Sequence, residues 1–178
     1  GIRDDAKLAA FRDLGIPFWL AGSFGSAEGL QQALAEGACG VQAGTAFALC
    51  GESGLAPEVR RELIRKALNG ESRVFTDPLA PPTGFPFKVA ELAGSLSDDA
   101  VYKQRRRICD LGSLRQPYRR AGGKIGYRCP AEPVDAYVAK GGKEEDTVGR
   151  KCLCNALIAN AGMPQRLPDG SEEKCLIT

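Results

Sequence analysis

The chain has 178 residues, of which 43% are hydrophobic and 26% are charged, and this composition is typical of a soluble globular protein of one domain or slightly more. No apolar run approaches the ~18 residues that a membrane helix needs, and the first ten residues lack an apolar segment of signal-peptide length. We therefore expect a cytoplasmic protein without a membrane partner. The chain has no histidine, which removes the commonest general base and the commonest zinc ligand.

The charges divide unevenly between the two halves of the chain. Residues 1–92 carry nine Lys/Arg and eleven Asp/Glu, whereas residues 93–178 carry fifteen and eleven, so the second half is the basic one. Regular strand and helix periodicity also stops near Ala93, where Gly, Cys, Arg and Pro become frequent. We predict two domains on this basis: residues 1–92, and a basic, cysteine-containing extension over 93–178 that is largely irregular or helical.

Three helices are predicted in the first half, over residues 6–15, 26–37 and 56–70. Leu8, Phe11 and Leu14 have helical spacing ahead of Gly15, a typical helix terminator. Ser26 is a candidate N-cap for the second helix. The third begins with a proline, which is common in the first turn of a helix.

Two apolar strands alternate with these helices, over residues 16–22 and 38–49. This alternation, with short connections, predicts an α/β fold in which helices cover parallel strands. Two parallel strands buried on both faces need neighbours. We therefore expect the chain to be one end of a larger domain, such as an eight-stranded β/α barrel, with the remaining strands as its partner.

A glycine followed by a small hydroxyl residue occurs in both predicted strand regions. Gly22, Ser23 and Gly25 follow the first strand, and Gly44 and Thr45 belong to the second stretch. In β/α barrels, glycine loops after neighbouring strands often let backbone N–H groups bind a phosphate. Either loop alone is also consistent with a tight turn that only ends a strand. The two together favour phosphate binding.

The stretch WLAGSFGSAEGLQQALAEGACGVQAGTAFALCGES, residues 19–53, resembles the final two β/α units of the nitronate monooxygenase (2-nitropropane dioxygenase-like) family. These are flavin enzymes on a TIM barrel, with an A-G-G loop, a G-A-x-G-V-Q-x-G-T strand and a following E-S. PPTGFPFKV, residues 81–89, is similar to the segment after the barrel in a flavin-dependent branch. One departure is Ser23, which replaces the second glycine of the A-G-G loop.

The resemblance implies the C-terminal portion of a (β/α)8 barrel and an FMN-dependent oxidoreductase that oxidises a nitronate or similar activated carbon acid with O2. It implies that the flavin phosphate is bound by Ala21, Gly22, Ser23, Gln42, Ala43, Gly44 and Thr45. A flavin-dependent enoyl reductase is an alternative with another small-molecule substrate. The family usually takes the substrate proton with a histidine, which this chain lacks, so the catalytic residue is unknown. Glu52 is a candidate carboxylate, or a solvated acid.

The seven cysteines predict either a metal site or reduced thiols, because the chain shows no secretory signal. Four thiolates in a basic region could bind zinc or an iron–sulfur cluster. The candidates are Cys109, Cys129, Cys152 and Cys154. Their spacing is not the usual paired C-x-x-C, so buried or free thiols are the alternative. Cys39 and Cys50 lie in apolar segments and are expected in the core.

A basic stretch with interleaved tyrosines runs from Tyr102 to Arg128, with nine Lys/Arg and a single acid. It could bind an acidic partner protein, or form a solvated face with structural salt bridges. Nucleic acid is not expected, because no stacking motif accompanies the charge. A second function class is therefore a noncatalytic binding or assembly module with a cysteine metal site and a basic docking face.

Overall fold

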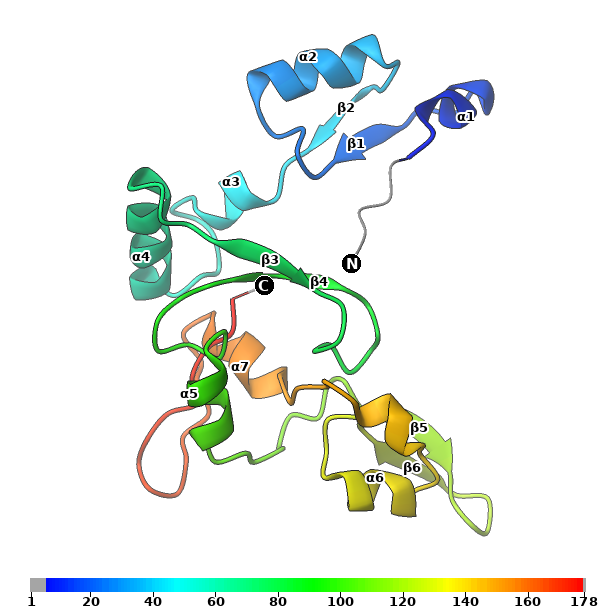
Figure 1. Cartoon of the computed structure of the whole chain (residues 1–178), viewed down its shortest axis with the longest axis vertical. Coiled ribbons are helices and arrows are strands. Elements are labelled where there is room, and N and C mark those ends of the chain that lie inside the picture. Colours follow the sequence, from blue (N-terminus) through cyan, green and yellow to red (C-terminus); the bar gives the residue numbers. More distant parts are fainter. Residues whose placement is uncertain (1–5, 178) are drawn as a thin grey trace. The chain divides into compact units, whose positions relative to one another are not determined.

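The computed structural model describes residues 6–177, and the chain divides into two compact units (Figure 1). The first unit ends at Leu55 and the second begins at Ala56. The boundary that the sequence places near Ala93 lies inside the second unit. The sheets are small: each of the three in the described residues has two strands.

The first unit contains the predicted alternation of helices and strands. Its elements are α1 (Leu8–Asp13), β1 (Trp19–Ala21), α2 (Ala27–Ala35), β2 (Gly40–Gln42) and α3 (Thr45–Ala48). Strands β1 and β2 pair in parallel, with Trp19 opposite Gly40 and Ala21 opposite Gln42. The second predicted strand is too long, however, because its last part forms helix α3.

Local sequence explains the ends of these helices. Gly15, which follows α1, has a φ of +64°, a left-handed conformation that glycine adopts without strain. Ser26 is the N-cap of α2, and its hydroxyl accepts a hydrogen bond from the Gly29 amide at 3.0 Å. Gly29 packs against the preceding loop, since a Cβ there would lie 2.7 Å from the Phe24 carbonyl oxygen.

The second unit is built from one long helix, two hairpins and several short helices. Its elements are α4 (Pro57–Leu68), β3 (Val74–Asp77), β4 (Phe87–Ala90), α5 (Asp99–Gln104), β5 (Gln116–Arg119), β6 (Ile125–Arg128), α6 (Val134–Ala139), the 3-10 helix η1 (Glu144–Thr147) and α7 (Cys154–Ala159). Both hairpins, β3 with β4 and β5 with β6, are antiparallel. The region after residue 92 is therefore less irregular than predicted, since it contains the β5–β6 hairpin.

The apolar core lies in the second unit. It gathers buried side chains from β4, the loop before α5, the start of α7 and the last residues: Val89, Leu96, Leu153, Ala156 and Leu176. Two backbone hydrogen bonds attach the last described residues to this core, from the Ala90 amide to the Ile177 carbonyl (3.0 Å) and from the Leu96 amide to the Cys175 carbonyl (2.8 Å).

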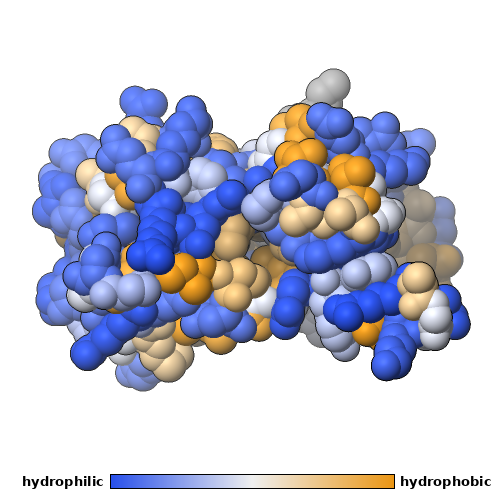
Figure 2. Space-filling view, turned by 90° about the horizontal axis from the view of Figure 1, so that it is seen from below, coloured by the Kyte–Doolittle hydropathy of each residue, from blue (hydrophilic) through white to orange (hydrophobic). Residues whose placement is uncertain are grey.

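The described residues form an α/β protein in which no sheet closes into a barrel. Residues 6–177 contain no helix with the length and apolar character needed to cross a bilayer. On the face shown in Figure 2, apolar side chains gather in patches between hydrophilic ones.

Candidate functional site

The parallel register of β1 and β2 brings the two predicted phosphate loops together. Because the strands run in the same direction, their carboxyl ends lie at the same edge, where Ala21 is opposite Gln42. The loops that follow also approach each other, since a Cβ added to Gly25 would lie 3.7 Å from the Ala43 Cβ. All seven residues predicted to bind FMN therefore belong to one edge of this small sheet.

The backbone of these loops is suited to binding an anion. Gly22 has a φ of +91°, which side-chain-bearing residues rarely adopt, and the space beside its Cα is open. The space beside Gly44 is open as well. No residue in the described range 6–177 accepts a hydrogen bond from the amides of Ser23, Gly44 or Thr45. These donors fit a phosphate group, which needs several convergent N–H groups.

The loop side chains are accessible. Ser23, Gln42 and Thr45 are exposed, so the two hydroxyls and the amide can reach a ligand outside the sheet edge. Ser23 takes an ordinary negative φ, so the side chain that replaces the family glycine causes no backbone strain. Glu52 is exposed in the turn after α3.

All seven cysteines lie within the described residues, and none of them forms a disulfide there. Of the four predicted metal ligands, Cys109 is exposed and the other three are half-buried. Among residues 6–177, no three Cys, Asp or Glu side chains are grouped closely enough to hold one metal ion. The core location expected for two others is wrong, because Cys39 is exposed and Cys50 only half-buried.

The three chain segments that carry these four thiols are joined by hydrogen bonds. The Asn155 amide, next to Cys154, donates to the Ile108 carbonyl at 2.9 Å, and Arg107 donates to the Ala131 carbonyl at 3.2 Å. The Leu114 amide donates to the Cys154 sulfur at 3.4 Å. Residues far apart in sequence therefore surround one region, which linear spacing alone does not reveal.

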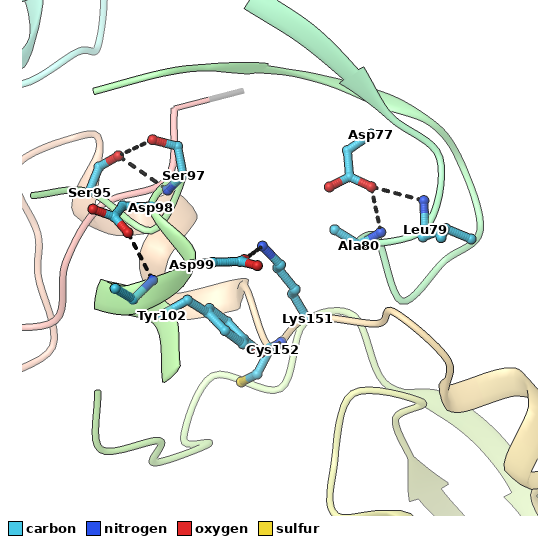
Figure 3. A network of polar contacts seen from close by, with 11 residues as sticks. Asp77, Leu79, Ala80, Ser95, Ser97, Asp98, Asp99, Tyr102, Lys151 and Cys152 are labelled. Atoms are coloured by element: carbon cyan, nitrogen blue, oxygen red, sulfur yellow. Dashed lines mark hydrogen bonds and ion pairs between the residues drawn. The ribbon is translucent and has the colours of Figure 1, made fainter. Parts of the chain in front are cut away.

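A polar network lies beside Cys152 (Figure 3). The Cys152 amide donates to the Tyr102 hydroxyl at 3.0 Å, and the Lys151 ammonium pairs with Asp99 at 2.8 Å. Lys151 also lies over the Tyr102 ring, 5.0 Å from its centroid. Figure 3 shows Lys151 extending toward Asp99 while the Cys152 sulfur points the opposite way.

Much of the basic stretch serves the fold of the second unit. Arg105 forms a buried ion pair with Glu173 at 2.6 Å, with side-chain exposures of 5% and 4%. Arg115 stacks over Tyr127, and Arg128 lies over Tyr118. The pairing of Arg105 with Glu173 could not be predicted from the sequence, because 68 residues separate the two charges. The alternating Arg and Tyr residues were the available signal for the stacking.

Comparison of the chain with protein-family models, with curated proteins and with solved structures found no match.

Proposed function

We propose that the loops after β1 and β2 bind the phosphate of FMN in an oxidoreductase of the nitronate monooxygenase type. The parallel register that pairs Ala21 with Gln42 is the observation that supports this proposal, because it directs both loops to the same side. The amides of Ser23 and Thr45, without acceptors among the described residues, can then donate to one dianion.

The residues of this chain bind and orient the flavin. When bound, FMN supplies the electron acceptor for oxidation of a nitronate or similar activated carbon acid. Gly22 lets the backbone turn toward the phosphate, and Gln42 supplies a side-chain amide at the end of β2. A base other than histidine, or one outside these residues, must remove the substrate proton, since the chain contains no histidine.

The remaining strands of a barrel are the partner that we propose for the first unit. Parallel strands occur almost only in sheets covered on both faces, and a two-stranded sheet is marginal by itself. Large apolar side chains of this unit are nevertheless exposed, including Ile16 (64%), Trp19 (59%) and Phe47 (69%). Neighbouring strands and helices would bury them.

Flavin binding to the full chain tests the phosphate site. The chain is titrated with FMN and with riboflavin, which lacks the phosphate, while backbone amide chemical shifts are recorded. We expect FMN to shift the amides of Ser23, Gly44 and Thr45, and riboflavin to leave these three unchanged. Equal responses to the two flavins, or FMN-induced shifts confined to other residues, would contradict the proposal.

A charge substitution provides the second test. Ser23→Asp places a carboxylate beside the phosphate, and we expect FMN affinity to fall at least tenfold, or about 1.4 kcal/mol. Ser72→Asp is the matched control, because Ser72 is an exposed serine between α4 and β3 and belongs to the second unit. An affinity of Ser23→Asp equal to that of the control would exclude this loop as the phosphate site.

A further inference from the structure

One face of the β5–β6 hairpin is exposed along its whole length. Directly opposed residues of an antiparallel pair lie on the same face, as do residues two apart in a strand, so two cross-strand pairs share one side of this hairpin. They are Pro117 with Tyr127 and Arg119 with Ile125. All four are exposed, Ile125 at 69% and Tyr127 at 54%, and three of the four line a hollow of about 340 Å³. We call these four residues the outer face of the hairpin.

The opposite face of the hairpin is occupied by contacts within the second unit. Tyr118 lies across Gly126, since a Cβ added to that glycine would lie 2.6 Å from the Tyr118 ring. The Arg128 guanidinium lies 5.3 Å from the centroid of the Tyr137 ring in α6, the helix beside the hairpin (Figure 1). Arg128 also donates to the Lys140 carbonyl at 2.8 Å. These contacts leave the outer face as the side without a partner.

The hairpin is strongly cationic. Residues 111–131 contain no Asp or Glu and include five basic residues: Arg115, Arg119, Arg120, Lys124 and Arg128. None of the five forms an ion pair with an Asp or Glu among residues 6–177. Their positive charge is therefore available to a negatively charged partner.

Arg115 adds an ordered cation beside the outer face. Its guanidinium lies 5.5 Å from the centroid of the Tyr127 ring, and its Nε donates to the Gly112 carbonyl at 3.0 Å. Both contacts restrict the Arg115 side chain before any partner binds. Side chains that are ordered in advance lose less conformational entropy on binding, so this arrangement favours association.

We propose that the outer face of the β5–β6 hairpin docks an acidic protein partner that presents carboxylates around an apolar side chain. Arginine binds carboxylates through two parallel hydrogen bonds, which suits Arg115 and Arg119 to such a partner. Between these cations, Ile125 and Tyr127 supply apolar area. Protein interfaces have this organisation, an apolar centre with a polar rim, and are enriched in Tyr and Arg.

The same face is less suited to nucleic acid. Interfaces with nucleic acid are more polar and more positively charged throughout, and single strands stack their bases on open aromatic rings. The aromatic ring of this face, Tyr127, is covered on one side by Arg115. The proposed docking surface belongs to the second unit, so it does not depend on the flavin loops of the first.

Binding of designed peptides to the full chain tests the chemistry of the partner. The main probe is a fluorescent helical peptide with a stripe of leucines flanked by glutamates. One comparison peptide has glutamine in place of each glutamate, and another has serine in place of each leucine. In fluorescence anisotropy we expect the acidic leucine peptide to bind about tenfold more tightly than either, and to weaken as salt is added. No binding, or equal binding of a comparison peptide, overturns the proposal.

Other classes of partner are measured in the same assay. A single-stranded oligonucleotide and vesicles of phosphatidylserine and phosphatidylcholine are compared with the acidic leucine peptide at one salt concentration. We expect both to bind more weakly than the peptide. Tighter binding of the oligonucleotide or of the vesicles would show that this surface serves nucleic acid or a membrane, and would overturn the assignment to a protein.

A charge reversal on the outer face locates the site. Arg119→Glu should weaken binding of the acidic leucine peptide about tenfold or more, because like charges then face each other. Arg73→Glu is the matched control, an exposed arginine of the same unit that lies before β3, and should stay within about twofold of the wild type. Equal affinities of the two variants would exclude the hairpin as the docking site.

The apolar centre needs a variant of its own. Ile125→Thr keeps a β-branched residue in the strand, and should remove the preference for the leucine peptide over its serine counterpart. Val74→Thr is the matched control in β3, where Val74 is 54% exposed, and should retain this preference. A preference that persists in Ile125→Thr contradicts the role of the apolar centre.

Amide chemical shifts of the wild-type chain give a readout without any substitution. Addition of the acidic leucine peptide should shift the amides of Arg119, Ile125 and Tyr127 most. Shifts confined to residues outside the hairpin would overturn the proposal even if the peptide binds.

Discussion

The two units bury their apolar residues to different extents. The second unit packs residues of distant segments into a closed core around Leu96 and Leu153, which are 0% and 1% exposed. Among residues 6–55 of the first unit, the buried apolar residues are small alanines, Ala33 and Ala38, while Trp19 and Phe47 remain exposed. The comparison teaches that regular secondary structure and a self-sufficient core are separate properties: the unit with the clearer periodicity has the poorer core.

Breaking the buried ion pair should produce the largest loss of stability. Arg105→Met leaves Glu173 as an uncompensated buried charge, and we expect the free energy of unfolding of the second unit to fall by about 3–5 kcal/mol. Urea unfolding measures the loss. Arg166→Met is the matched control, because the Arg166–Glu172 pair is exposed and its atoms lie 3.9 Å apart. A loss as small as that of the control would show that the pair does not stabilise the fold.

Truncation of the core should have the next largest effect. Leu96→Ala removes a fully buried side chain from the second unit, and we expect a loss of about 2–5 kcal/mol in urea unfolding. Leu68→Ala is the control at the end of α4, where the side chain is 82% exposed, and should change the free energy by less than about 0.5 kcal/mol. Equal effects would mean that the core does not determine the stability of this unit.

A smaller effect is expected in the first unit. Ser26→Ala removes the hydroxyl that accepts from the Gly29 amide, at a cost of about 1 kcal/mol to helix α2. Hydrogen exchange of the α2 amides should accelerate by a corresponding factor while the second unit is unaffected. Ser72→Ala, which removes an exposed loop hydroxyl, serves as control. Faster exchange in the core around Leu153 would show that the units unfold together.

The smallest effect concerns pH. The hydrogen bond from Lys151 is the largest cause that lowers the pKa of Asp99 below its ordinary value of 3.8 (Figure 3). The pair therefore contributes stability above that value, and loses it as the pH falls through the lowered pKa. Because the Asp99 side chain is 68% exposed, screening limits the contribution to roughly 0.3 kcal/mol. Asp99→Asn should remove this part of the pH dependence of unfolding, and an unchanged acid limb would contradict the role of the pair.

Features that depend on residues close together in the sequence were predicted best. The glycine, serine and proline signals located the ends of α1, α2 and α4, and the alternation of elements predicted the parallel pairing of β1 with β2. Helix α3 was missed because its apolar residues, read alone, suit a strand as well as a short helix.

Features that depend on distant residues were harder to predict. The β5–β6 hairpin has a local signal, since the glycine pair Gly122 and Gly123 lies between the strands and both residues have positive φ. The many Arg and Lys residues around this pair favoured the interpretation of the segment as a basic surface stretch and not as a hairpin. The candidate site in the first unit could be placed because one strand–helix–strand unit fixes both loops. The loops around the cysteines are joined across 24 residues (Arg107 to Ala131) and 47 residues (Asn155 to Ile108), which spacing alone does not show.

Leu153 links thiol chemistry to the integrity of the second unit. Its side chain fills the core, while the residues on either side of it are Cys152 and Cys154. Oxidation enlarges these two half-buried side chains, and added bulk on both sides of Leu153 would disturb its contacts, since packed interiors tolerate little change in volume. Oxidation of these thiols is therefore expected to expose the core to proteases, so that chemical damage leads to degradation of the whole unit.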